Sequence, residues 1–198
     1  MSRRKLERFK QNEQSRNVIQ PGKELFETIK GNWKPVQFEN ENPLVVELAC
    51  GRGEFTVGLA REYPGSNFIG VDIKGSRIWK GSTIAIAEGL QNVAFLRTQI
   101  QLLDRYFDAG EISELWITFP DPQLRGSRFK KRLTHPRFLR LYQTILQSGG
   151  LVHLKSDSPD IYQFTITVIN LFQLDLLESS DNVYAASSVK PELQIKTH

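Results

Sequence analysis

Cysteine is almost absent from this chain of 198 residues, because Cys50 is the only one. A single cysteine excludes a disulfide within the chain, and this usage fits a reducing compartment such as the cytoplasm. Histidine is also sparse, and His135, His153 and His198 are too scattered for the spacing of a zinc site. No apolar run approaches the length that spans a membrane. We therefore expect a cytoplasmic protein without a metal site or a membrane segment.

Acidic residues are missing from one stretch, although the whole chain is only mildly basic, with 26 Lys and Arg against 22 Asp and Glu. No Asp or Glu lies between Asp121 and Asp157. Basic residues occupy the same stretch: Arg125, Arg128, Lys130, Lys131, Arg132, Arg137, Arg140 and Lys155. Many charge runs are simply solvated loops, but this concentration favours contact with nucleic-acid phosphates.

Length and composition predict one folded domain with a basic arm in front of it. The arm covers residues 1–16 and carries Arg3, Arg4, Lys5, Arg8, Lys10 and Arg16. Residues 17–43 have the glycine and proline punctuation of irregular chain. We expect an arm and an irregular lead-in over residues 1–43 and the main domain over residues 44–198.

From residue 44 onward, apolar strands alternate with helical patterns. The expected strands are 44–49, 67–72, 92–97, 112–118 and 150–156, and the expected helices are 53–63, 75–89, 135–147 and 159–172. Such alternation predicts an α/β fold, with a mostly parallel central sheet and helices on both faces. Ligands of these sheets bind at the carboxyl ends of the strands.

The segment 47–53 turns the first of these strands into a helix through two glycines. Gly51 and Gly53 allow tight backbone geometry and the close approach of a ligand. Asp72 ends the next strand, where a carboxylate can accept hydrogen bonds from both ribose hydroxyls. The turn alone is also typical of an ordinary strand–helix connection, but with Asp72 it indicates a nucleotide-type cofactor.

Two cofactor classes use this layout. A dinucleotide fingerprint needs Gly or Ala at the position of Thr56, so it fits badly. An acidic residue before the glycines, here Glu47, suits S-adenosylmethionine, because this ligand carries a cationic amine and a sulfonium. The pattern therefore favours S-adenosylmethionine.

The segment Phe119-Pro120-Asp121-Pro122 follows the fourth expected strand. The two prolines restrict the backbone around Asp121, so its carboxylate is held stiffly at the ligand edge. Asp157 follows the fifth expected strand at the same edge, where it can hold the amino edge of a base or cap the next helix. A basic loop, residues 125–132, comes directly after the Asp121 turn.

These motifs together resemble the bacterial tRNA (guanine-N7-)-methyltransferases, which methylate guanine 46 in the tRNA variable loop. The resemblance covers about residues 44–172, and its most specific element is the Phe-Pro-Asp-Pro turn followed by Lys130-Lys131-Arg132. It implies a Rossmann-like methyltransferase fold over residues 44–198, S-adenosylmethionine as cofactor, tRNA as substrate and no metal.

The resemblance also implies roles for individual residues. Asp121 is the implied catalytic residue. The implied cofactor contacts are Glu47, Gly51, Gly53, Asp72, Gln99 and Asp121. The implied substrate-binding residues are Arg125, Asp157, Thr197 and His198. The implied RNA-interacting residues are Ser127, Arg128, Lys130, Lys131 and Arg132.

Several positions depart from the family pattern. Ala49 replaces a glycine, at an expected cost of one methyl group of space, and Gln99 replaces an aspartate that meets the adenine. Gln123 replaces a common tryptophan. Thr197-His198 begins a family Thr-x-Phe/Tyr-Glu motif without its glutamate, and a last strand is also missing. We therefore expect the chain to be truncated at this end.

Two alternatives fit part of the same pattern. One is another S-adenosylmethionine-dependent enzyme that methylates an exocyclic amine of RNA or DNA, but such enzymes carry an aromatic residue where Gln123 stands. The other is an RNA-binding relative without catalysis, which the intact Glu47, Asp72 and Asp121 argue against and Gln99 leaves open. The sequence also leaves open whether the protein is a monomer or a homodimer.

Overall fold

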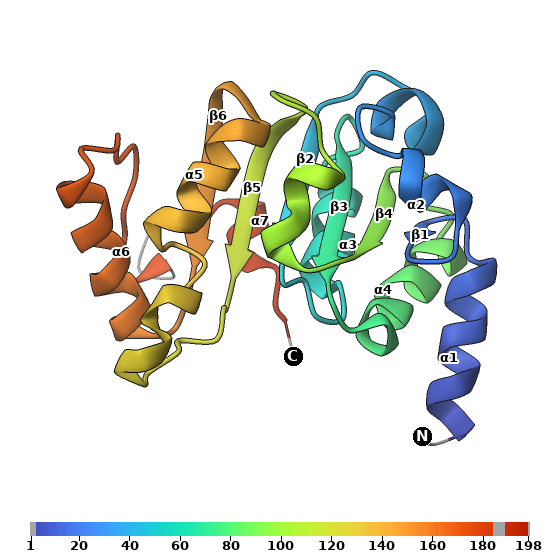
Figure 1. The fold of residues 1–198 in the computed structure, drawn as a ribbon, viewed down its shortest axis with the longest axis horizontal. Coiled ribbons are helices and arrows are strands. Elements are labelled where there is room, and N and C mark those ends of the chain that lie inside the picture. Colours follow the sequence, from blue (N-terminus) through green and yellow to red (C-terminus); the bar gives the residue numbers. More distant parts are fainter. Residues whose placement is uncertain (1–2, 184–188, 198) are drawn as a thin grey trace.

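The computed structural model describes residues 3–183 and 189–197, and in this part of the chain six parallel strands form one sheet (Figure 1). The order is β1-β4-β3-β2-β5-β6. The strands are β1 Val18–Ile19, β2 Leu44–Leu48, β3 Asn67–Asp72, β4 Val93–Arg97, β5 Ile112–Thr118 and β6 Leu146–Lys155. The α-helices are α1 Arg3–Gln14, α2 Glu24–Thr28, α3 Glu54–Glu62, α4 Gly75–Ala87, α5 Pro136–Ile145, α6 Pro159–Leu171 and α7 Pro191–Gln194. A π-helix, η1, covers Trp33–Phe38, and 3₁₀ helices cover Ile100–Arg105 (η2) and Gly126–Lys131 (η3).

The central strands are buried on both faces. Successive strand side chains point to opposite faces, so Val45 and Val46 of β2 belong to two separate hydrophobic clusters. Val46 lies in the cluster that contains Tyr142 of α5, whereas Val45 lies in the cluster that contains Phe55 of α3 and Ile78 of α4. This arrangement confirms the predicted α/β fold with helices on both faces.

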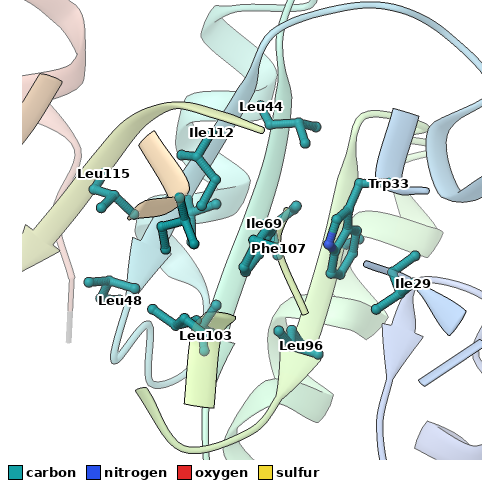
Figure 2. Close-up of a cluster of buried hydrophobic side chains, with 14 of the residues drawn as sticks. Ile29, Trp33, Leu44, Leu48, Ile69, Leu96, Leu103, Phe107, Ile112 and Leu115 are labelled. Atoms are coloured by element: carbon teal, nitrogen blue, oxygen red, sulfur yellow. The ribbon is translucent and has the colours of Figure 1, made fainter. Parts of the chain in front are cut away.

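The segment 17–43 adds core that the sequence patterns missed. Val18 pairs with Phe95 of β4, which makes β1 an edge strand of the sheet. Trp33 is fully buried, stacks on Phe107 with ring centroids 5.3 Å apart, and donates its indole N–H to the Tyr106 carbonyl at 2.8 Å (Figure 2). The expectation of irregular chain over this segment is therefore wrong, because a two-residue strand and a five-residue helix are too short to show a periodic pattern.

The basic arm is a helix that packs on α4. Asn12 of α1 is fully buried and donates its side-chain amide to the Gly75 carbonyl at 2.8 Å. Arg8 places its guanidinium 4.6 Å from the ring centroid of Trp79. Figure 1 shows α1 beside α4, at the end of the sheet formed by β1 and β4. Among the described helices, none combines the length and apolarity needed to cross a membrane.

The carboxyl ends of the strands share one edge of the sheet. β2 pairs with β3 on one side and with β5 on the other, so the connection direction reverses between β2 and β5. Ligands of doubly wound sheets bind at such a reversal. Thr118 at the end of β5 pairs in register with Lys155 at the end of β6. The prediction that the 47–53 and 119–122 turns meet at one edge is therefore confirmed.

Candidate active site

The turn after β2 depends on left-handed backbone at Ala49, Gly51 and Gly53, whose φ angles are 57°, 57° and 73°. A Cβ on Gly53 would lie 2.5 Å from the Cε1 atom of Phe95, whereas a Cβ on Gly51 would meet nothing within 4 Å. Gly53 is therefore required by packing, and Gly51 leaves open space beside the backbone. This space fits the close approach of a cofactor.

Ala49 carries a cost that the sequence did not indicate. The expected cost of replacing glycine was one methyl group of space. Its φ of 57° adds backbone strain, because L-residues in this region lose about 1 kcal/mol relative to glycine. The expectation for Ala49 is corrected accordingly.

Glu47 connects three elements beneath the turn. Its side chain accepts the backbone N–H of Thr56 at 2.9 Å, the Thr56 hydroxyl, and the Thr118 hydroxyl at 2.5 Å. Thr56 lies in the first turn of α3, whose N-cap residue Gly53 offers no side chain, so Glu47 caps this helix from β2. Burial of the carboxyl, which is 2% exposed, raises the pKa of Glu47 to about 7. Its contact with a cofactor stays a prediction.

Asp72 lies against the glycine turn. One carboxylate oxygen accepts the N–H of Gly51 at 3.0 Å, and the other accepts the N–H of Lys74 at 2.7 Å. A carboxylate has about four acceptor positions, so two remain for ribose hydroxyls. Gln99 is exposed just beyond β4, the strand that pairs with β3, and is therefore at the same edge. These positions fit the proposed cofactor.

Asp121 is exposed on a turn that is fixed at both ends. The N–H of Phe119 donates to the Lys155 carbonyl at 2.7 Å, which extends the pairing between β5 and β6. The N–H of Gln123 donates to an Asp121 carboxylate oxygen at 3.0 Å. Phe119 and Gln123 both have positive φ angles, 44° and 48°. Strained backbone of this kind is concentrated at functional sites.

Asp157 follows the neighbouring strand and is also exposed. The helix-capping role considered for it belongs to Ser158, whose hydroxyl accepts the N–H of Ile161 at 3.5 Å. In the described part of the chain, no hydrogen bond occupies the Asp157 carboxylate. Asp121 and Asp157 thus follow adjacent strand ends with carboxylates open to a ligand.

The basic loop lies beside the Asp121 turn. Helix η3 exposes Ser127, Arg128, Lys130 and Lys131. Within the described residues, no ion pair joins the three basic side chains to a carboxylate. Arg132 instead donates to the Pro122 carbonyl at 3.0 Å, with its guanidinium 4.7 Å from the Phe164 ring centroid. A hollow of about 320 Å³ is lined by Asp121, Pro122, Gln123, Leu124, Arg125 and Arg128.

Two other predicted positions lie at the end of the chain. Thr197 is half-buried just beyond α7, and His198 lies outside the described residues. Within residues 3–183 and 189–197, no group of three or more His, Cys, Asp or Glu side chains could hold a metal. A hollow of about 470 Å³ at the amino edge of the sheet, lined partly by Gly31 and Leu44, contains none of the predicted site residues.

Sequence reasoning missed two groups of the site. The Thr118 hydroxyl donates a hydrogen bond to Glu47, and Lys155 is buried at the end of β6. A threonine at the end of an apolar strand gives no signal by itself. A lysine at the end of an apolar strand is unusual, because lysine is rarely buried without a partner, so it could have indicated a specific role for this side chain.

Comparison with known proteins defines the class. The family model described as "Putative methyltransferase" matches residues 41–196. The crystal structure of the aminoglycoside resistance methyltransferase NpmB1 has the same fold, with a TM-score of 0.51 and 20% identity over 72% of this chain and 68% of that chain. The chain is therefore a methyltransferase with the predicted Rossmann-like fold.

Two relatives narrow this class. A protein of Christiangramia forsetii named tRNA (guanine-N(7)-)-methyltransferase is 47% identical over 188 residues, 92% of this chain and 84% of that protein. A Porphyromonas gingivalis protein of the same name is 50% identical over 171 residues, 86% of this chain and 69% of that protein. The chain belongs to the tRNA (guanine-N(7)-)-methyltransferase family, which confirms the resemblance inferred from its motifs.

Proposed function

We propose that this protein transfers a methyl group from S-adenosylmethionine to N7 of guanine 46 in the variable loop of tRNA. The observation that carries the proposal is the placement of Asp121 and Asp157 after adjacent strands, at the same sheet edge as the Asp72–Gly51 pair and beside an exposed basic loop. The names of the relatives support the tRNA substrate. The cytoplasmic location predicted from cysteine usage agrees with this substrate.

The glycine turn and the β3 end fit the cofactor. Asp72 would hold the ribose hydroxyls with its two remaining acceptor positions, and the open side of Gly51 would admit the amino acid part. Gln99 would hydrogen-bond the adenine amino group through its amide oxygen. When bound, S-adenosylmethionine supplies an electrophilic methyl carbon. Glu47 shapes the turn by holding α3 against β2 and β5.

Guanine N7 needs no general base, because it carries a free lone pair and no proton. Catalysis therefore depends on positioning N7 in line with the methyl group and on stabilising charge. The base becomes positively charged as the methyl group arrives. Asp121 and Asp157 would accept hydrogen bonds from the guanine amino edge and stabilise that charge. The stiffness of the Asp121 turn keeps its carboxylate in place without reorganisation.

The basic loop supplies tRNA affinity in this proposal. Arg128, Lys130 and Lys131 are exposed and unpaired by carboxylates in the described residues, so phosphates can neutralise them. Arg125, at the base of the loop, lines the hollow beside Asp121 and would bind the guanine nucleotide. Helix α1 adds a second basic surface.

The test is methyl transfer from radiolabelled S-adenosylmethionine to unmodified tRNA, followed by identification of the labelled nucleoside. Label in 7-methylguanosine that disappears when guanine 46 is replaced is the expected result. Label in another nucleoside would leave a methyltransferase with a different target, such as an exocyclic amine. Cofactor binding without label would instead indicate an RNA-binding relative that has lost catalysis.

A further inference from the structure

Lys155 is a buried lysine at the carboxyl edge of the sheet, two residues before Asp157. It is the last residue of β6 and is 7% exposed. Its Nζ donates to the backbone carbonyls of Leu193 at 2.6 Å and Ile195 at 3.1 Å. No carboxylate pairs with it in the part of the chain that the structure describes. Burying a lysine without a counter-ion costs free energy, and the two carbonyl contacts offset part of that cost.

Three elements of the site converge on this side chain. The Nζ of Lys155 is 5.6 Å from the Phe119 ring centroid and 6.0 Å from the Phe55 ring centroid. Phe119 begins the turn that presents Asp121, and Phe55 lies on α3 beside the glycine turn. Lys155 therefore joins the segment 193–195 to the Asp121 turn and to α3. Burial in these surroundings lowers the pKa of Lys155.

The segment 191–197 lies along α3. Ile195 approaches so closely that a Cβ on Gly58 would be 2.7 Å from its Cγ2 atom. Tyr63 donates its hydroxyl to the Glu192 carboxylate. In Figure 1 the chain beyond α7 runs toward the edge of the sheet where β5 ends. The hydrogen bond between Lys155 and the Ile195 carbonyl therefore holds this segment at the carboxyl edge of the sheet, two residues before Thr197.

We propose that Lys155 is a positioning residue that seats the segment 193–197 against the Asp121 turn. The proposal rests on the proposed methyl transfer, because the seated segment brings Thr197 toward the guanine side of the site. In this role Lys155 acts through backbone carbonyls, and the role requires no contact with substrate or cofactor. Its loss should therefore lower turnover and leave cofactor affinity intact.

Lys155→Met is the variant that tests this role, since it keeps the packed stem and removes the three N–H donors. We expect kcat for tRNA methylation to fall at least tenfold, about the effect of one charge-assisted hydrogen bond. The Kd for S-adenosylmethionine should stay within twofold. Lys190→Met is the matched control, because Lys190 is exposed just before the same segment and pairs with Glu178. It should keep wild-type kcat.

Hydrogen–deuterium exchange measures the seating directly. Backbone amides of residues 193–197 should exchange faster in Lys155→Met and not in Lys190→Met. Ile195→Ala weakens the apolar side of the same contact and should give the same pair of effects. The double variant Lys155→Met/Ile195→Ala should lose no more kcat than the more damaged single variant, because both substitutions release one segment.

Unchanged exchange in Lys155→Met would overturn the seating role, as would additive losses in the double variant. Faster exchange with unchanged kcat would show that the seated segment does not serve the reaction. A fall in kcat together with a cofactor Kd raised tenfold would assign Lys155 to the cofactor end instead. If the wild-type protein methylates no tRNA, the proposed function fails, and the exchange data still decide whether Lys155 seats the segment.

Discussion

The two ends of the candidate site are built differently. At the cofactor end, Glu47 and Asp72 are buried, and backbone or hydroxyl donors of the same chain already hold them. At the substrate end, Asp121, Asp157 and the loop 125–131 are exposed. A small cofactor gains affinity from a site formed in advance, whereas an RNA brings phosphates that complete a charged surface. Under the proposed function, the chain would organise the cofactor half and the bound RNA would complete the other.

Asp121 gives the largest expected effect. Asp121→Ala should lower kcat about 10²- to 10³-fold, because it removes charge stabilisation at the reacting base. The Kd for S-adenosylmethionine, measured by calorimetry, should change less than threefold. Asp72→Asn is the contrasting variant, with cofactor affinity reduced about tenfold. If Asp121→Ala weakens the cofactor as much as Asp72→Asn, the two ends are not separate.

Glu47 should make the stability of the cofactor end depend on pH. Its folded pKa of about 7 lies above its usual 4.5, so its stabilising contribution is present below pH 4.5 and is lost as pH rises through 7. Glu47→Gln has no such loss. Between pH 4.5 and 8, its unfolding free energy should therefore rise by about 3 kcal/mol relative to that of wild type. Denaturant titrations at several pH values measure it.

The control for that measurement is Glu62→Gln, which changes an exposed carboxylate on α3. It should leave the pH profile of wild type unchanged. Parallel profiles for wild type and Glu47→Gln would contradict the raised pKa and would mean that the ionised carboxylate is well accommodated.

The basic loop should affect only the substrate end. Replacing Arg128, Lys130 and Lys131 with glutamine should reduce the slope of log Kd for tRNA against log salt by about one for each phosphate that is no longer neutralised. Cofactor affinity should not change. Lys34→Gln, at the amino edge of the sheet, is the control and should keep the wild-type slope. The same slope in the triple variant would exclude the loop from phosphate binding.

Ala49 gives the smallest effect. Ala49→Gly relieves left-handed strain but frees the unfolded chain, so the unfolding free energy should rise by roughly 0.5 kcal/mol. Thermal unfolding of the two proteins side by side measures this change. A destabilised glycine variant would mean that the Ala49 methyl packs usefully at the turn.

Local signals in the sequence predicted much of this molecule. The run from β2 into the Gly51–Gly53 turn has a strong apolar strand and two glycines that the backbone needs. The capping of α3 by Glu47 was not predictable, because it also depends on Thr118, which lies 71 positions away. The contact of Lys155 with Ile195 spans 40 positions and depends on the path of the segment beyond α7. Such long-range pairings leave no periodic pattern.

The pairing of β1 with β4 has a consequence for synthesis of the chain. Val18 lies beside Phe95, and α1 docks on α4, so these contacts of α1 and β1 cannot form until α4 and β4 have been made. Contacts between segments so far apart in the chain also form less readily than local helices, because closing a long loop costs entropy. Helix α1 therefore docks late, after α4 and β4 have been translated.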